Sequence, residues 1–567
     1  MIAVTWGRKY KNGDLIFMKS PKDFKVLLVY PNLTMLLVPS LAIALFTGAL
    51  KKAGYQVGLF DTTHYIWGPT SLDTRRENLQ HRPFDTEKDL GVSLKTDIIG
   101  DFIKKVDEFQ PDLLIVSAVE DTFLQAVELL DAVKEANIPN ILGGVFATMA
   151  PEVALSYPQV QMIGVGEGEE TIIEVSERIR RGESCDDVKN VRFKRPDGTI
   201  VSNPLRPLVD IDKPIPDFSL YDEARFYRPM GGRIFKTFPL ETYRGCPYSC
   251  TFCNSPVQSS FNWQNDLGAF VRRKRIDVVR DEIAELIETY SPEYFYIIDD
   301  SFLARPEQEV YEFTEMYGEF GIPFWFNTRP EGTSAKRLAA LKAVGADRIS
   351  YGLECGNEDY RRNVIKRSPT NDEILRSFET ISDGGITFSV NNIIGFPGET
   401  REMIFETIEL NRQIRGFDSL SVGIFTPYHG TGLRQLSIDK GYLDPSLITK
   451  HTVSSSLLTQ PHITPEEIDG ILKTFMLYVR FPKEDWSDIK IAEGQTGEAD
   501  EKFKEFQERY RATYLSGIQT SPEDWEDPTK YVKAPQAEEP TADVAWGFNC
   551  GVEQTEYVMP PNGGNDN

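Results

Sequence analysis

The sequence has few of the features that would mark a disulfide scaffold, a membrane protein or a nucleic-acid binder. Six cysteines among 567 residues are too few for a disulfide framework. The best apolar run, residues 36–50, is interrupted by Pro39 and is shorter than the ~18 residues that a membrane span needs. The first 20 residues lack the apolar centre of a signal peptide. We therefore expect a cytoplasmic protein with no membrane partner.

Basic residues are also scarce, since 62 Lys and Arg face 86 Asp and Glu and give a net charge of −24. Binding to a phosphate backbone needs clustered positive charge, so we expect no nucleic-acid partner. One short basic run, Arg272–Arg275, stands out, and we expect its side chains to be solvated or paired within the protein.

The length and the changes of pattern predict several domains. A chain of 567 residues with 40% hydrophobic content is too long for one core and has ample apolar residues for more. The pattern predicts a leader over 1–23, an α/β domain over 24–183, a hairpin and linker over 184–236, a second α/β domain over 237–435, a helical segment over 436–516 and a largely disordered acidic tail over 517–567.

Both α/β domains are predicted from short apolar runs that alternate with longer helical patterns. In the first domain we expect strands at 25–31, 55–60, 111–117, 140–142 and 161–164, which favours a doubly wound parallel sheet with ligands at the carboxyl ends of its strands. In the second, about six βα units between residues 238 and 425 favour a partial, TIM-like (β/α)6 barrel.

Three of the six cysteines fall within eight residues, as Cys246, Cys250 and Cys253 with the spacing CxxxCxxC. Three thiolates on one tight loop can hold three irons of a 4Fe–4S cubane and leave the fourth iron open for a chelating substrate. A zinc site is the alternative, but structural zinc usually takes four ligands, and no second Cys or His pair lies nearby.

This motif, with Phe252 before the last cysteine, resembles that of the radical S-adenosylmethionine (SAM) superfamily over residues 238 to about 430. The resemblance implies that SAM binds the open iron and is cleaved to methionine and a 5′-deoxyadenosyl radical. It also implies SAM-binding residues at later strand ends, although this chain has Asp-Asp where the family more often has Gly-Gly-Glu. These candidates are Asp299, Asp300, Glu354, Asn392 and Gly395.

Three further residues are candidates for catalysis near the same strand ends. Cys355 follows Glu354 directly and is either a catalytic thiol or a small buried residue. Tyr428 and His429 come just after the last expected strand, and His429 is either an acid or base toward substrate or a loop hydrogen-bonding residue.

Residues 24–183 resemble the cobalamin-binding domain that precedes many radical SAM modules, in which small residues at strand ends make room for the nucleotide tail of cobalamin. A plain Rossmann-like domain is the alternative. The mutase-type DxHxxG sequence is absent, so no cobalt-ligating histidine is expected, and His64 is a poor substitute. The candidate cobalamin-binding residues are Asn32, Ser117, Gly143, Gly144, Gly166, Glu167 and Gly168.

Together these resemblances imply a radical SAM enzyme that uses a 4Fe–4S cluster, SAM and cobalamin to methylate an unactivated carbon, or a phosphinate, of a small molecule. A reductant such as flavodoxin or ferredoxin is the implied protein partner. A cobalamin-dependent oxidative cyclase or rearrangement enzyme is the alternative, and a non-catalytic cobalamin or redox sensor is a distant one. A methylthiotransferase is disfavoured because only Cys185 precedes Cys246.

Overall fold

The computed structural model describes residues 19–67, 86–195, 197–213, 215–230, 233–449 and 455–514. Most of the expected leader and all of the expected acidic tail over 517–567 lie outside these residues. The chain forms two compact units: the first contains residues 1–69, 92–225 and 257–270, and the second contains 70–91, 226–256 and 271–567.

The first unit is built on a seven-stranded sheet with the order β2-β1-β3-β4-β5-β6-β7. Its strands are β1 (Lys25–Tyr30), β2 (Gln56–Asp61), β3 (Leu113–Ser117), β4 (Asn140–Gly143), β5 (Met162–Gly164), β6 (Val191–Lys194) and β7 (Ile200–Ser202). Its helices are α1 (Leu41–Lys52), α4 (Ile98–Phe109), α5 (Glu120–Ala132), α6 (Val145–Met149), α7 (Pro151–Ala154) and α8 (Glu169–Arg180).

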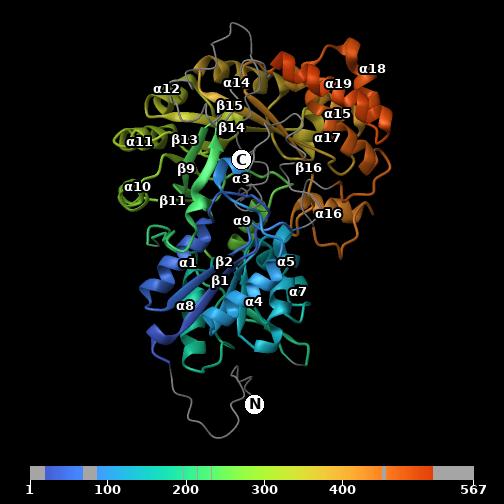
Figure 1. The fold of residues 1–567 in the computed structure, drawn as a ribbon. Helices are drawn as coiled ribbons and strands as arrows, with labels where there is room; N and C mark the ends of the chain where they lie inside the picture. The colour runs from blue at the N-terminus through green and yellow to red at the C-terminus, as the bar shows by residue number, and fades with distance from the viewer. Residues whose placement is uncertain are drawn as a thin grey trace. The chain divides into compact units, whose positions relative to one another are not determined.

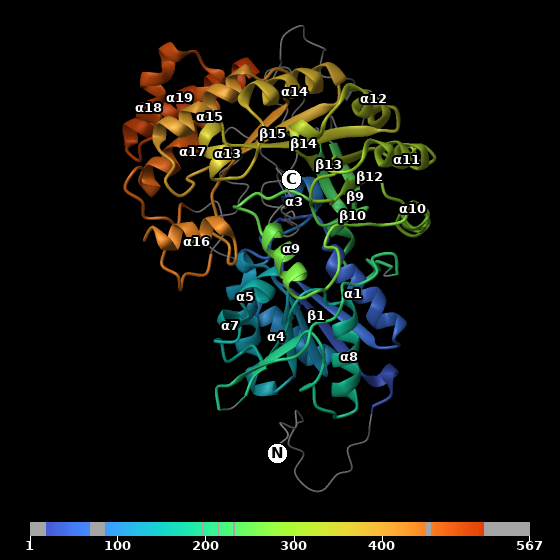
Figure 2. The same cartoon turned by 180° about the vertical axis from the view of Figure 1, so that it is seen from behind.

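Strands β1 to β5 are parallel, and helices cover both faces of their sheet, with α1 and α8 on one face and α4 and α5 on the other (Figures 1 and 2). The expected doubly wound sheet is thus confirmed. The apolar runs that predicted these strands are buried because helices cover both faces. Strands β6 and β7 extend the sheet as the expected antiparallel hairpin.

The second unit contains nine strands, which are β8 (Tyr227–Met230), β9 (Arg233–Leu240), β10 (Tyr243–Arg244), β11 (Arg272–Arg273), β12 (Tyr294–Ile297), β13 (Phe324–Thr328), β14 (Ala346–Glu354), β15 (Thr387–Ile394) and β16 (Ser419–Ile424) among its described residues. Helix α3 (Thr86–Leu90) precedes these strands in the chain. The helices between the strands are α10 (Ile276–Tyr290), α11 (Glu307–Tyr317), α12 (Ala335–Ala343), α13 (Glu358–Asn363), α14 (Asn371–Gly384) and α15 (Arg401–Gln413). The later helices are α16 (Gly432–Asp439), α17 (Pro465–Arg480), α18 (Trp486–Ala492) and α19 (Gly497–Tyr514). Helix α9 (Ser255–Gln264) follows the cysteine loop, and its residues from Val257 belong to the first unit.

Six parallel strands run in the order β16-β15-β14-β13-β12-β9, with α10, α11, α12 and α14 along the outer side of the sheet (Figure 1). This is the expected partial barrel. The antiparallel strand β8 on its edge was not expected, because Pro229 and a proline-rich approach hide its strand pattern. No helix among the described residues is long and apolar enough to cross a membrane.

Candidate active site

The cysteine loop lies at the carboxyl end of β9, where parallel strands of such sheets present their ligands. Gly245, at φ 88°, lets the chain turn out of β10 directly into Cys246, a conformation that a side chain would oppose. Cys246 and Cys250 are buried and Cys253 is half-buried, and all three line one pocket of the second unit. The predicted ligand residues are therefore brought together.

The donor set of this pocket fits an iron–sulfur cluster. Burial, followed by the nearby Asp300 carboxylate, raises the pKa of Cys246 well above its usual range, and burial also raises the pKa of Cys253. A bound cationic cluster would instead lower the pKa of these thiols, because it stabilises their ionised, thiolate form. No three His, Cys, Asp or Glu side chains in the described part of the chain converge on a single ion. A cubane instead binds each cysteine through a separate iron.

Two arginines that the sequence did not single out also line the pocket. The Arg329 guanidinium lies 3.8 Å from the ring centroid of Tyr248, which belongs to the cysteine loop. Arg367 donates to Glu354 at 3.1 Å and to the carbonyl of Gly352 at 2.6 Å. Both cations favour the ionised form of the Cys246 thiol. They stand far from the cysteine motif in sequence, so no local pattern could have identified them.

The two neighbouring aspartates after β12 have different surroundings although both line the pocket. The Asp299 carboxylate accepts hydrogen bonds from the backbone N–H groups of Thr242 and Tyr243, at 2.7 and 2.9 Å, and pairs with Arg305. Asp300 instead acts electrostatically on Cys246 and Cys253. Of the two predicted SAM-binding aspartates, Asp299 therefore braces the cysteine loop, and Asp300 acts on the thiols.

Glu354 and Gly395 lie where the sequence placed them, at the ends of β14 and β15. Glu354 is buried at φ 69°, and burial raises its pKa while Arg367 opposes the rise. Gly395, at φ 81°, turns the chain after β15, and its N–H donates to Glu399 at 2.7 Å.

The side-chain amide of Asn392, a predicted SAM-binding residue, is engaged by Asn411 of α15 and by the carbonyl of Ser421. In the pairing of β14 with β15 the register shifts between Gly352 and Glu354, so that Gly352 lies opposite Asn391 and Glu354 lies opposite Asn392. The preceding residue, Asn391, is 4% exposed, and its amide has no hydrogen-bond partner among the described residues. Alternation along β15 therefore turns Asn391, rather than Asn392, to the face that carries Ser350 and Ser389.

The three predicted catalytic residues lie outside the lining of the cysteine pocket. Cys355 is fully buried in an apolar cluster with Tyr360 and Phe396, and burial raises its pKa, which favours the packing alternative. His429 Nε2 lies 3.0 Å from a nitrogen of Arg434, whose guanidinium also binds loop carbonyls. The backbone carbonyl of Tyr428 accepts a hydrogen bond from Thr431 within the same loop.

In the first unit, the predicted cobalamin-binding residues gather at the carboxyl edge of the sheet, where β1 lies between β2 and β3. This strand order has its switch point between β1 and β3, the usual place for a ligand in such sheets. Asn32 follows β1 and is buried, with its amide donating to the carbonyl of Leu36 and to Thr63. Ser117 ends β3. The side chain of Asn32 therefore shapes the loop, and does not point freely to a ligand.

Two glycines of this edge, Gly143 and Gly166, leave open space that we call the glycine cradle, and Gly144 lets the chain pack closely beside it. A Cβ at Gly144, where φ is 118°, would lie 2.2 Å from the carbonyl oxygen of Ala118. A Cβ at Gly143 would meet only the Gly164 oxygen at 4.0 Å, and one at Gly166 would meet nothing within 4 Å. This room fits a nucleotide tail threading past the strand ends.

The other two predicted residues are engaged within the unit. Glu167 accepts a hydrogen bond from the backbone N–H of Val209 at 2.7 Å, so it ties down the chain beyond the hairpin. A Cβ at Gly168 would lie 2.8 Å from the ring of Phe46, so this glycine allows α8 to approach α1 closely.

Loop 36–38 at the same edge is held by an arginine that the sequence did not reveal. Arg225 is 2% exposed and donates to the carboxylate of Asp61 at 2.6 Å. It also donates to the carbonyls of Leu36, Leu37 and Val38.

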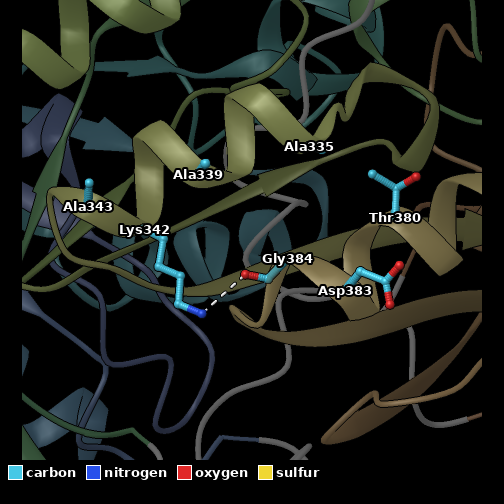
Figure 3. A pocket seen from close by; sticks show the side chains of 7 residues that line it. All are labelled: Ala335, Ala339, Lys342, Ala343, Thr380, Asp383 and Gly384. Carbon is cyan, nitrogen blue, oxygen red and sulfur yellow. Dashed lines mark hydrogen bonds between the residues drawn. The ribbon is translucent and has the colours of Figure 1, made fainter.

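A larger hollow, of about 550 Å³, lies between α12 and α14 on the outer side of the barrel sheet (Figure 3). It is lined by three alanines of α12 together with Thr380, Asp383 and Gly384, and Lys342 donates across it to the Gly384 carbonyl at 3.2 Å. It contains neither thiol nor imidazole, so the smaller cysteine pocket carries the chemistry.

Comparison with known proteins identifies both domains. The model of the radical SAM superfamily matches residues 240–410, and the model of the B12 binding domain matches residues 36–176. The chain therefore belongs to the radical SAM superfamily and carries a B12 binding domain ahead of its radical SAM domain. It is a cobalamin-dependent radical SAM enzyme, and its cofactors are a 4Fe–4S cluster, SAM and cobalamin.

Individual relatives are distant. An uncharacterised methyltransferase of Pyrococcus horikoshii, PH0819, is 25% identical over 391 residues, covering 68% of this chain and 82% of that protein. The anaerobic magnesium-protoporphyrin IX monomethyl ester cyclase of Rubrivivax gelatinosus is 26% identical over 364 residues, covering 61% of this chain and 62% of the cyclase. The solved structure of the cobalamin-dependent SAM radical enzyme OxsB, with aqua-cobalamin and SAM bound, has a TM-score of 0.58 at 16% identity and covers 86% of this chain and 71% of OxsB. That likeness shows a shared fold.

Proposed function

We propose that the protein is a methyltransferase that methylates an unactivated carbon, or a phosphinate, of a small molecule. The observation that carries the proposal is the pocket of three thiols in a chain that also has a B12 binding domain. The similarity to the methyltransferase of Pyrococcus horikoshii supports methyl transfer as the outcome.

In this proposal the chain's residues bind and orient the cofactors, which supply the radical and the methyl group. Cys246, Cys250 and Cys253 ligate the cluster, and Asp300 and Glu354 bind SAM. The glycine cradle of the first unit binds cobalamin. Each methyl transferred consumes two SAM and two electrons from an external reductant, such as flavodoxin or ferredoxin, and yields one methionine, one 5′-deoxyadenosine and one S-adenosylhomocysteine.

A cobalamin-dependent oxidative cyclase or rearrangement enzyme is the second candidate, supported by the 26% identity to the magnesium-protoporphyrin cyclase. The products of SAM distinguish the two. Methyl transfer gives S-adenosylhomocysteine together with 5′-deoxyadenosine, whereas the second candidate gives 5′-deoxyadenosine alone.

The test is anaerobic reconstitution with iron, sulfide and hydroxocobalamin, followed by desalting and metal analysis. We expect about four irons and about one cobalt per chain. Cys250→Ala should remain folded but lose the cluster and SAM cleavage. Cys355→Ala is the matched control, since it removes a buried thiol of the same unit outside the pocket. SAM cleavage retained in Cys250→Ala would refute the ligand assignment, and iron without cobalt would refute the methylcobalamin mechanism.

A further inference from the structure

The cysteine loop is braced at its start by a buried polar cluster centred on Asp299. Strands β9 and β12 end side by side, with Leu240 opposite Ile297, so the residues that follow them meet. One carboxylate oxygen of Asp299 accepts the two backbone N–H bonds from Thr242 and Tyr243. The other accepts the hydroxyl of Thr242 and pairs with Arg305.

Arg305 completes this brace from the other side. It also donates to the Thr242 hydroxyl at 2.9 Å and to the carbonyl of Phe302 at 2.6 Å. Its guanidinium lies 4.4 Å from the ring centroid of Tyr243. The side chains of Asp299 and Arg305 are 1% and 4% exposed, so water cannot replace a lost partner. Removing one partner would leave a buried charge uncompensated.

The loop is also held further along, at Thr251 between the second and third cysteines. The backbone N–H of Thr251 donates to the carbonyl of Ile365 at 3.1 Å, and its carbonyl accepts from Leu433 at 3.0 Å. The chain between Thr242 and Thr251, which contains Cys246 and Cys250, is therefore fixed at both ends.

We infer that Asp299 is a positioning residue that fixes the cysteine loop for cluster binding, whereas Asp300 keeps the SAM-binding role that the proposed function gives it. This inference rests on the proposed cluster ligands. Both hydrogen-bonding oxygens of Asp299 are already used by the loop and by Arg305, so the carboxylate has no role left toward a ligand amino group. Asp300 lines the same pocket.

The test separates cluster retention from SAM affinity in the reconstituted full-length protein. Iron removal by a chelator reports cluster retention, and equilibrium dialysis with SAM, together with the electron paramagnetic resonance signal of the reduced cluster, reports SAM binding. In Asp299→Asn we expect the half-time of iron removal by the chelator to fall on the order of tenfold to 100-fold, because a charged hydrogen bond is lost. The chains that keep a cluster should bind SAM with wild-type affinity. Asp300→Asn should retain iron normally but bind SAM more weakly.

Thr242 supplies a milder pair of variants in case Asp299→Asn does not fold. Thr242→Val removes one hydroxyl of the brace and should weaken iron retention about fivefold, whereas Thr242→Ser keeps the hydroxyl and should behave as wild type. Normal iron retention with weakened SAM binding in Asp299→Asn, or equal retention in the two Thr242 variants, would overturn the inference. A wild-type protein that holds no iron would instead overturn the cluster assignment itself.

Discussion

The buried pair of Lys274 and Glu282 offers the sharpest test of how the barrel unit is stabilised. Lys274 follows β11, and its ammonium group lies 2.7 Å from the carboxylate of Glu282 on α10, with side chains 1% and 6% exposed. Its backbone N–H donates to the carbonyl of Thr242, so the pair also supports the approach to the cysteine loop. Lys274 belongs to the basic run Arg272–Arg275, and its pairing with Glu282 agrees with the expectation that this run is solvated or paired within the protein.

Replacing Lys274 with Met should lower the free energy of opening of α10 by about 3–5 kcal/mol, because one buried charge is left unpaired. This corresponds to a change in the opening equilibrium on the order of 100-fold to several thousand-fold. Replacing both partners, as Lys274→Met with Glu282→Leu, should recover most of the loss, because no buried charge then remains.

The stability lost in Lys274→Met should depend on pH, and the raised pKa of Glu282 gives the direction. Burial raises the pKa of Glu282 in the wild type, and Lys274 opposes that rise. Without Lys274 the folded-state pKa rises further above the unfolded value, so the folded variant binds a proton more tightly than the unfolded chain. The variant should therefore be least stable at alkaline pH and recover as pH falls through the raised pKa.

Native-state hydrogen exchange of the α10 amides measures this local opening without assuming a single transition for the two-unit chain. The control is Arg280→Met on the same helix, whose ion pair with Asp281 is exposed and should contribute little. Wild-type protection in Lys274→Met, or a double variant as unprotected as the single one, would refute the reasoning.

Three further predictions concern other buried positions. Burial raises the pKa of Glu399 to about 8, so wild-type stability should fall as pH rises through that value. In thermal unfolding, the stability of Glu399→Gln should depend less on pH than that of the wild type. Parallel pH profiles of the two proteins would contradict this. Gly144→Ala should weaken cobalamin binding, measured by equilibrium dialysis. Its Cβ would lie 2.2 Å from the Ala118 oxygen, so the chain that carries the neighbouring Gly143 must shift. Unchanged binding would exclude that edge as the cradle. Arg225→Met should increase hydrogen exchange over residues 33–40 by at least the order of tenfold, since it leaves loop carbonyls and a carboxylate unpaired; unchanged exchange would show that the loop does not depend on it.

Several features of this protein follow from its sequence alone. The alternation of apolar runs and helical patterns is local and repeats often, so it predicts both parallel sheets. The expected strands at 25–31 and 140–142 lie close to the observed β1 and β4. The CxxxCxxC spacing is equally local, and the three cysteines lie in one pocket as expected. The glycines at 143, 144 and 166 indicated room at a strand edge for the same reason.

Only the tertiary structure decided which partners each of two neighbouring residues has. Asp299 and Asp300, or Asn391 and Asn392, are equivalent in a sequence motif. The direction of Asn391 follows from alternation along β15, and that of Asp299 follows from the residues that meet at the ends of β9 and β12. The partners that fix those directions, Arg305 for Asp299 and Asn411 for Asn392, come from other elements. Arg329, Arg367 and Arg225 reach their sites in the same way, because long-range packing, and no local pattern, determines where a buried guanidinium finds its partners.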